Sequence, residues 1–457
     1  MPASLAGLLL KSARQRVVVA ALAVLFMWAV AIWAIALNAP APISTAPTSA
    51  PLPSSLRLII ATGQPAPTGG DFNRFDVATQ PIVAPVNARG HVVFYASVVH
   101  SKQTEGIFLD VGSRIVKSAA LGDPVPGGGL LSEFAKHPTP SLNSADKVAF
   151  GAAVSGARAS EGVFLAGDGA LKVIALSGND APGVPTGTFA EFDTPTLNDR
   201  DEVAFVATVR RGREMLQVLY LHSAGKLRKL IAEGDPTPVI PADPTRPRGT
   251  FSKFGVPVIN NKGVIVLPAV IDRGDVLGGI FVTGTRDLAR LLAVGETISP
   301  GTMLVRFSER VALDDDNNIA FGAHVGAGAA ANTEALFLWN AASGLTHVAA
   351  VGDSAPGGGR YSAFGAWPSL GSHAAVTFVA GIDDGPGPAG LYVWRAGDTR
   401  RVAMTGDRLP DHTKLPAFAL NPVASAGPNG GITFATMSAP ESGQTGIYYF
   451  GPPPSAE

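Results

Sequence analysis

The sequence predicts an all-β fold, a seven-bladed β-propeller with four strands in each blade. A segment of about 57 residues recurs seven times, and its last copy lacks the fourth strand. Leu56 to Gly63, just before the first copy, fits the template of that strand, so Leu56 to Ala61 would complete the last blade. An array that borrows its first strand in this way predicts a closed ring without exposed sheet edges. The copies begin at Gly63, Gly122, Gly178, Gly234, Gly295, Gly352 and Gly406.

Each strand of a blade is visible in the third copy as a short apolar stretch. We expect these strands at Phe189 to Leu197, Glu202 to Thr208, Gln217 to Leu221 and Leu227 to Ala232. A tight turn, Asn198 to Asp201, separates the first two strands, and its fourth residue tolerates positive φ in six of the seven copies. This residue is Gly90, Asp146, Asp201, Gly263, Asn317, Ala374 or Gly430.

Large apolar residues in the second strand predict the contacts between blades. In five of the seven copies the run before this residue is uninterrupted by polar residues, as in Val-Ala-Phe205, which indicates a strand buried on both faces. In a propeller each blade packs between two others, so we expect these side chains to act as wedges. They are Phe94, Phe150, Phe205, Leu267, Phe321, Phe378 and Phe434.

The turn and the strand after it resemble a known repeat. Asn143-x-x-Asp-x-Val-Ala-Phe150 and Asn87-x-x-Gly-x-Val-Val-Phe94 are similar to the NxxGxxAF tandem-repeat proteins, a bacterial group with various surface anchors. The similarity covers about 395 residues and implies an exported, anchored protein, but no activity. Copies six and seven depart from the pattern, since Gly371 and Gly427 replace the asparagine. We expect their turns to be built differently.

Composition restricts the classes of function. The chain has 35 basic and 36 acidic residues, and this balance gives no attraction to nucleic acid. The absence of cysteine excludes disulfides, thiolate nucleophiles and cysteine metal sites. No phosphate-binding loop or metal-binding histidine motif occurs, so we expect no cofactor and no metal.

The amino terminus predicts export. Residues 17–37 form an apolar run of roughly 31 Å as a helix, preceded by Lys11, Arg14 and Arg16. The positive-inside rule puts residues 1–16 in the cytoplasm and the repeats across the membrane, in the periplasm or at the cell surface. The alternative is a cleaved signal peptide and a secreted protein, since Ala34-Ile35-Ala36 offers a cleavage site.

The remaining organisation follows from composition. Residues 38–55 hold five prolines and no charge, which predicts an extended tether. The repeat domain extends over residues 56–450, and we expect residues 451–457 to be a disordered tail.

Candidate functional residues are sought where the copies differ, because the fold alone does not require those side chains. One position in the first strand carries Arg74, Glu133, Glu191, Lys253 and Arg306 in the first five copies. Innermost strands line the channel of a propeller, so these side chains would surround a polar binding pocket, unless they are only a solvated wall. Glu133 and Glu191 would be the acid and base of a hydrolase if they faced one cavity.

Other acidic residues fit turns better than sites. The residue after each opening glycine is acidic in five of seven copies, but Asp before Pro, as in Asp123-Pro124, is typical of a turn whose carboxylate caps backbone amides. The run Asp314 to Asn318 falls on the hairpin turn and lacks the pattern of a calcium loop.

Two functions remain open. The favoured one is a membrane-anchored, non-catalytic module that binds a protein or glycan of the cell envelope. The longest opening loop, in copy four, carries Arg246 and Arg248 and would be its recognition surface. The alternative is an exported hydrolase or lyase with its site in the central channel.

Overall fold

The structure is a computed structural model, and it describes the repeat domain with short gaps. The described residues are 56–76, 80–134, 136, 139–238, 248–285, 287–328, 331–409, 413–437 and 445–454. Among them no helix has the length and apolar character needed to cross a membrane. The apolar run 17–37 and the tether 38–55 lie outside this part of the chain.

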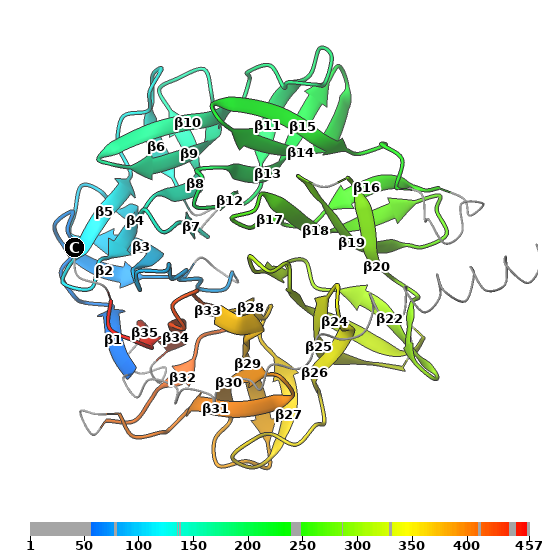
Figure 1. The fold of residues 1–457 in the computed structure, drawn as a ribbon. Coiled ribbons are helices and arrows are strands. Elements are labelled where there is room, and N and C mark those ends of the chain that lie inside the picture. Colours follow the sequence, from blue (N-terminus) through cyan, green and yellow to red (C-terminus); the bar gives the residue numbers. More distant parts are fainter. Residues whose placement is uncertain are drawn as a thin grey trace, which may run out of the picture. The chain divides into compact units, whose positions relative to one another are not determined.

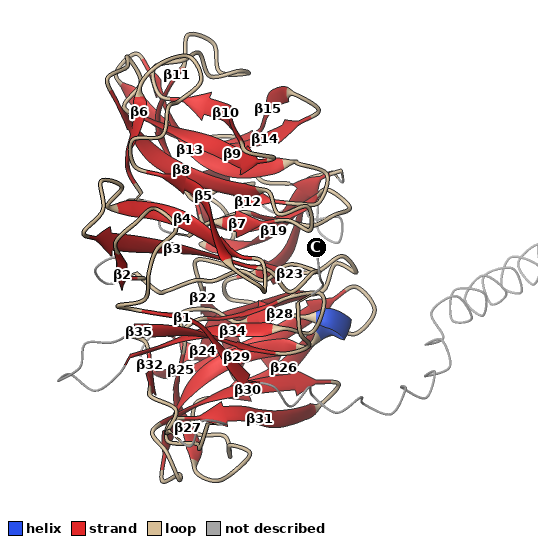
Figure 2. Cartoon of the chain, turned by 90° about the vertical axis from the view of Figure 1, so that its left-hand side faces the viewer, coloured by secondary structure: helices blue, strands red, loops and turns tan. Residues whose placement is uncertain are grey.

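Seven antiparallel sheets are arranged around a central axis, which confirms the seven-bladed propeller (Figure 1). The third blade shows the pattern, with β13 (Val203–Arg211), β14 (Glu214–Ser223) and β15 (Lys226–Ala232) paired in sequence order. Turned by 90°, the sheets lie side by side along the ring (Figure 2). The first blade contains β2 (Asp71–Arg74), β3 (Val92–Val99), β4 (Glu105–Asp110) and β5 (Ile115–Ala120). The second blade contains β6 (Leu130–Glu133), β7 (Ser141–Leu142), β8 (Val148–Ser155), β9 (Glu161–Gly167) and β10 (Ala170–Leu176). The fourth blade contains β16 (Thr250–Phe254), β17 (Val258–Ile259), β18 (Val264–Asp272), β19 (Gly278–Gly284) and β20 (Ala289–Ala293). The fifth blade contains β21 (Thr297–Ser299), β22 (Thr302–Phe307), β23 (Ala312–Leu313), β24 (Ile319–Gly328), β25 (Ala331–Asn340) and β26 (Gly344–Ala350). The sixth blade contains β27 (Arg360–Phe364), β28 (Ser369–Leu370), β29 (Val376–Asp383), β30 (Ala389–Arg395) and β31 (Asp398–Met404). The seventh blade contains β32 (Ala417–Phe418), β33 (Ala424–Ala426), β34 (Ile432–Met437) and β35 (Thr445–Phe450).

The ring closes as predicted. β1 (Leu56–Ala61) pairs antiparallel with β35 and completes the seventh blade, the blue strand beside the red one in Figure 1. Arg57 also reaches the first blade, where its Nη2 lies 2.8 Å from Asp110 Oδ2. The closing strand therefore joins the two ends of the array and ties the seventh blade to the first.

The innermost strand is interrupted, which corrects the single strand expected from Phe189 to Leu197. β11 (Thr188–Phe192) pairs with the end of β13, and β12 (Thr196–Leu197) pairs with its beginning. Pro195 lies between the two segments and has no N–H to donate to the ladder. The equivalent short strands of neighbouring blades contact one another around the axis, so they form the narrow part of the channel wall.

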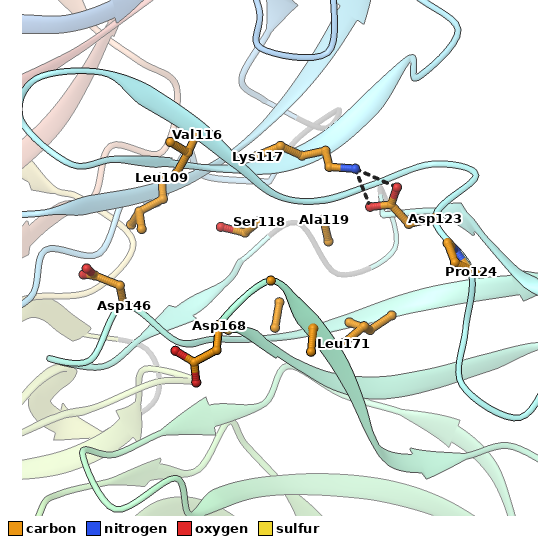
Figure 3. Close-up of a pocket in the computed structure, with 14 residues that line it drawn as sticks. Leu109, Val116, Lys117, Ser118, Ala119, Asp123, Pro124, Asp146, Asp168 and Leu171 are labelled. Carbon is orange, nitrogen blue, oxygen red and sulfur yellow. Dashed lines mark hydrogen bonds and ion pairs between the residues drawn. The ribbon is translucent and has the colours of Figure 1, made fainter.

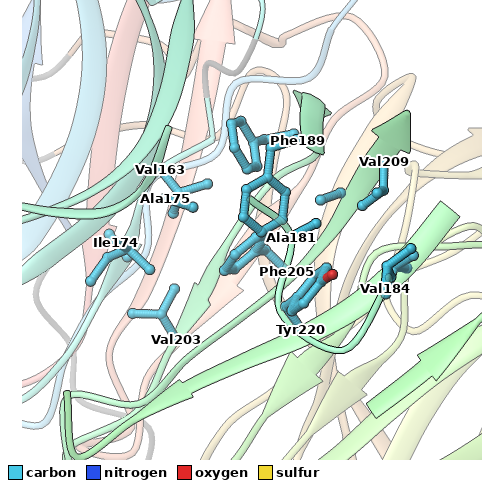
Figure 4. Packing of buried hydrophobic residues seen from close by; sticks show 14 of the residues in the cluster. Val163, Ile174, Ala175, Ala181, Val184, Phe189, Val203, Phe205, Val209 and Tyr220 are labelled. Carbon is cyan, nitrogen blue, oxygen red and sulfur yellow. The ribbon is translucent and has the colours of Figure 1, made fainter. Parts of the chain in front are cut away.

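The predicted wedges are buried between blades. Phe205 is fully buried, and Figure 4 shows it in a cluster that includes Val163 and Ala175 of the second blade and Tyr220 of the third. Phe205 and Tyr220 stack with their ring centroids 5.9 Å apart. The other six predicted wedges are also at most 2% exposed. Each blade therefore shares its core with its neighbour.

The asparagine of the turn links one blade to the next. Asn198 Oδ1 accepts hydrogen bonds from the amides of Arg200 and Glu202, which closes its own turn. Its Nδ2 donates to the carbonyl of Asn260 in the next blade at 2.9 Å. The same link joins Asn87 to Asn143, Asn143 to Asn198 and Asn260 to Asp314. The turn motif is thus a connection between blades as well as a turn.

The turns of copies six and seven differ, as expected from Gly371 and Gly427. Copy six forms a short 3-10 segment, Ser372–Ala374, in which two residues have positive φ. In copy seven Asn429 replaces the usual asparagine by accepting the amide of Gly431 at 2.8 Å.

The described chain continues beyond the last strand. Residues 451–454 of the predicted tail are described, and the Pro452 carbonyl accepts a hydrogen bond from the Tyr449 hydroxyl at 2.8 Å.

Candidate functional site

The centre of the ring holds connected spaces along the axis. A narrow throat is lined by the short inner strands and also by Arg310 and Trp367. Arg310 and Trp367 line a wider cavity as well, so this cavity is one mouth of the channel. The other end of the throat shares Leu197 and Leu313 with a space ringed by the asparagine turns.

The wide cavity, which we call the mouth cavity, has a volume of about 840 Å³. Its wall mixes aromatic, amide and hydroxyl side chains with charged groups of both signs. Its polar lining residues in the described chain are Gln80, Lys136, Thr139, Glu191, Asp193, Thr194, Thr208, Gln217, Lys253, Arg306, Ser308, Glu309 and Arg310. A cavity of this size with a few convergent polar groups is the usual form of a ligand site.

Two exposed apolar side chains stand at the mouth cavity. Leu277 is 75% exposed and Val270 is 47% exposed, and both line it. Large apolar side chains open to solvent beside a cavity are a common sign of a binding surface.

One missing side chain widens the mouth cavity between the fourth and fifth blades. In four other blades a glutamate or glutamine of the equivalent strand accepts a hydrogen bond from an amide of the next blade, as Gln217 Oε1 does from Phe254 at 2.9 Å. Glu161 makes the same contact with Phe192 at 2.8 Å. The fourth blade has Gly278 there, and Gly278 and Phe307 both line the cavity.

The sequence-predicted ring is partly brought together here. Glu191, Lys253 and Arg306 line the mouth cavity, whereas Arg74 and Glu133 are not among its lining residues. Arg74 Nε instead donates to Asp76 Oδ1 at 3.1 Å. Glu191 is therefore the carboxylate of the predicted pair that faces the cavity.

Of the two predicted rim arginines, the structure describes Arg248. Arg246 lies outside the described residues. Arg248 donates from Nε to the Thr237 carbonyl at 2.8 Å, a contact that holds its own loop.

Sequence reasoning missed the pair at the base of the mouth cavity, Arg310 and Trp367. The guanidinium carbon of Arg310 lies over the Trp367 ring, 5.5 Å from its centroid. Burial lowers the pKa of Arg310 to about 10, and attraction by Asp193 opposes this shift. Arg310 therefore keeps its positive charge at neutral pH. These two residues occupy one repeat position, four before the first residue of the turn, and comparing the copies there reveals them.

A second cavity, of about 450 Å³, lies between the first and second blades. Figure 3 shows its residues, with Lys117 Nζ joined to Asp123 at 2.8 Å and 3.1 Å. Asp123 Oδ2 also accepts the amide of Ala120 at 2.8 Å. The carboxylate thus caps its turn, as predicted for the residue after the opening glycine, and Asp235, Asp353 and Asp407 make the same contact.

The acidic run of copy five is also a turn. Asp314 Oδ1 accepts the amides of Asp316 at 2.9 Å and Asn318 at 2.8 Å. Among the residues that the structure describes, no group of three or more His, Asp or Glu side chains is placed to hold a metal ion.

Comparisons with known proteins bear on the family and the fold. A model described as Family of unknown function (DUF7453) matches residues 48–312 and 313–455. The resemblance to the NxxGxxAF proteins stays a prediction. No curated protein matches the sequence.

Solved structures similar to this chain include an oligogalacturonate lyase in complex with manganese, at 10% identity over 87% of this chain and 98% of that one, with a TM-score of 0.45. The β-propeller domain of the trilobed protease from Pyrococcus furiosus is 9% identical over 71% and 95%, with a TM-score of 0.36. A puromycin-hydrolysing peptidase of Mycobacterium tuberculosis is 14% identical over 81% and 51%, with a TM-score of 0.40. Similarities of this size carry no argument about function.

Proposed function

The chain belongs to this family, whose description assigns no activity, and from the geometry of the mouth cavity we propose that the protein is a glycan-binding module of the cell envelope. The observation that carries the proposal is a large cavity that combines neutral polar side chains with exposed Leu277 and Val270. A sugar ring presents hydroxyl groups at its edge and apolar C–H groups on its faces. The cavity offers partners for both.

The neutral polar groups favour a glycan over a protein partner. Thr139, Thr194, Thr208, Gln80 and Gln217 line the cavity and supply hydroxyl and amide groups. A protein partner would fill a cavity mainly with a few large aromatic or arginine side chains. A cavity with many small neutral donors and acceptors fits the hydroxyl groups of a glycan better.

Export of the site is part of the proposal. The apolar run 17–37 would anchor the chain, and the proline-rich segment 38–55 would hold the ring away from the bilayer. The mass of the mature protein recovered from membranes distinguishes the anchor from a cleaved signal peptide.

The test uses the full-length chain in detergent on arrays of glycans and peptides. Leu277→Asp should reduce binding to the glycans that the unaltered chain captures by roughly tenfold, because it removes apolar contact at the cavity. Leu420→Asp is the matched control, since Leu420 is 72% exposed and does not line the cavity. Equal loss in both variants, or capture of peptides but no glycan, contradicts the proposal.

A second candidate, a hydrolase or lyase, is favoured by the carboxylates of Glu191, Asp193 and Glu309 in the same cavity. Such groups serve as general acids and bases when substrate lies within hydrogen-bonding distance. Turnover of a glycan or ester panel that is lost in Glu191→Gln and retained in Glu133→Gln would support it. No turnover, or turnover that survives Glu191→Gln, removes it.

A further inference from the structure

One repeat position, four residues before the turn, lies at the mouth cavity in blades two to six, and two of its seven residues are unlike the rest. Five are small or aliphatic, and the blades five and six contribute Arg310 and Trp367. The ring consists of Val83, Thr139, Thr194, Val256, Arg310, Trp367 and Val423. Since five copies fold with small residues at this position, the fold does not require a cation or an indole there.

The main chain holds Arg310 firmly. Its carbonyl accepts a hydrogen bond from Ser308 Oγ at 2.8 Å, and the residue bridges to Val256 of the fourth blade. The amide of Val256 donates to the Glu309 carbonyl at 3.2 Å. The guanidinium then stacks on Trp367, so its position is set before any ligand arrives.

The donors of this guanidinium are unused. Within the described residues Arg310 makes no side-chain hydrogen bond and no ion pair. Arg310 is partly exposed, so its unpaired donors are open to a ligand in the cavity, and arginine is suited to paired contacts with an oxyanion. From this arrangement we infer that Arg310 binds a carboxylate group of a ligand that enters the mouth cavity.

A monoanion suits the site better than a dianion. Asp193 also lines the mouth cavity and lies close enough to act on the charge of Arg310. Its Oδ1 accepts the amide of Thr194 at 2.7 Å, which keeps the carboxylate in place. The fixed Asp193 carboxylate repels a phosphate or sulfate dianion about twice as strongly as a monoanion at the same distance, and the guanidinium fork matches the two oxygens of one carboxylate.

This inference rests on the proposed function and narrows it to glycans that carry an acidic sugar. The test is calorimetric titration of the full-length chain in detergent with glucuronate, and with glucose as the uncharged counterpart. We expect glucuronate to bind and glucose to bind at least tenfold more weakly. Equal affinity for the two sugars overturns the inference.

Variants separate Arg310 from the general charge of the protein. Arg310→Gln should weaken glucuronate binding by roughly tenfold to a hundredfold, because a charge-assisted hydrogen bond is lost. Arg228→Gln makes the same chemical change at an exposed residue that does not line the cavity, and it should leave the affinity unchanged. A melting curve for each variant shows that it is folded.

Asp193→Asn keeps the inference testable even if Arg310→Gln does not fold. We expect it to tighten glucuronate binding and to admit sulfate, since the repelling carboxylate is gone. Sulfate or phosphate binding to the unaltered chain as tightly as glucuronate would overturn the carboxylate assignment. If Leu277→Asp abolishes glycan capture and Arg310→Gln leaves it unaffected, the proposed glycan-binding function holds, but the inference that Arg310 binds an acidic sugar is wrong.

Discussion

At the scale of single residues, the turn asparagine explains why the repeat keeps its motif. Asn260 is 4% exposed, and its Oδ1 accepts the amides of Lys262 and Val264 within its own turn. Its Nδ2 donates to the Asp314 carbonyl at 2.9 Å. An aspartate can keep the first role but not the second, because an ionised carboxylate has no hydrogen to donate.

Asn260→Asp should therefore lower the free energy of unfolding by about 1–3 kcal/mol, since it replaces a donor with a charged acceptor beside a carbonyl. Denaturant unfolding of the full-length chain measures the change. The control is Asn179→Asp, at the exposed position after an opening glycine where other copies carry aspartate. Similar losses in the two variants would show that the link between blades is not the cause.

A buried histidine predicts how stability depends on pH. Burial and the nearby Lys172 charge lower the pKa of His222 below its ordinary value of 6.5, and the side chain is largely shielded from solvent. Below that pH the unfolded chain binds a proton that the folded chain resists, so stability falls as the pH falls. His222→Gln should give a flatter stability profile between pH 7 and about 5.

The matched control for this pH effect is His100→Gln, because the His100 side chain is 80% exposed. Urea midpoints at several pH values provide the comparison. A profile that stays steep in His222→Gln and flattens in His100→Gln would assign the effect to the wrong residue.

At the scale of single elements, the closing strand acts through one face. Ile60 is 3% exposed and belongs to a core cluster with Phe72 and Ile447, whereas Leu58 on the same strand is 42% exposed. Ile60→Asp should lower the unfolding free energy by at least about 2 kcal/mol and the melting temperature by several degrees, because it buries an unpaired charge.

Leu58→Asp makes the same chemical change on the open face of β1 and should alter the melting temperature little. Deleting Leu56 to Thr62 removes the whole strand and exposes the edge of β35. A melting temperature that Ile60→Asp and the deletion both leave unchanged would mean that the ring does not depend on this closure.

Elements were predictable from the sequence where repetition made their pattern visible. β1 begins and ends at the predicted residues, Leu56 and Ala61, because six copies define the template of the fourth strand. The inner strand was predicted wrongly, since the predicted stretch crosses Pro195 and the hydrogen-bond ladder is interrupted there. Hydrophobic pattern reports burial, and it does not report where pairing with the neighbour stops.

At the scale of the whole molecule, the candidate site combines side chains that are far apart in the sequence. Glu191, Lys253 and Arg306 could be predicted because one repeat position carries different charges in different copies. Gly278 gives no signal in the sequence because it matters through the side chain that it lacks. Arg310 stands at a repeat position that carries valine or threonine in five of the seven copies, and only an alignment at that position reveals it. Which of these residues share a cavity depends on the split inner strands, which the sequence does not show.

The links between blades are not uniform around the ring. The asparagine connection runs from the first blade to the fifth and ends at Asp314, whose carboxylate has no hydrogen to donate, and Gly371 and Gly427 have no side chain to make the link in the next two copies. At Gly371 φ is −100°, a backbone conformation open to any residue, and a Cβ added there would lie 3.3 Å from Ala426 Cβ and 3.6 Å from the Gly427 carbonyl oxygen. In the first four copies the side-chain amide of the asparagine donates to the equivalent carbonyl of the next blade.

Gly371→Asn should therefore add a hydrogen bond from the sixth blade to the Gly427 carbonyl of the seventh and raise the unfolding free energy by about 0.5–1.5 kcal/mol. Gly427→Asn is the contrasting variant, since its Cβ would meet Val86 Cγ1 and the Val86 carbonyl at 2.8 Å and should destabilise the ring. Denaturant midpoints of the full-length variants measure both effects. If Gly371→Asn destabilises the chain as much as Gly427→Asn, the missing asparagine is not what weakens this part of the ring.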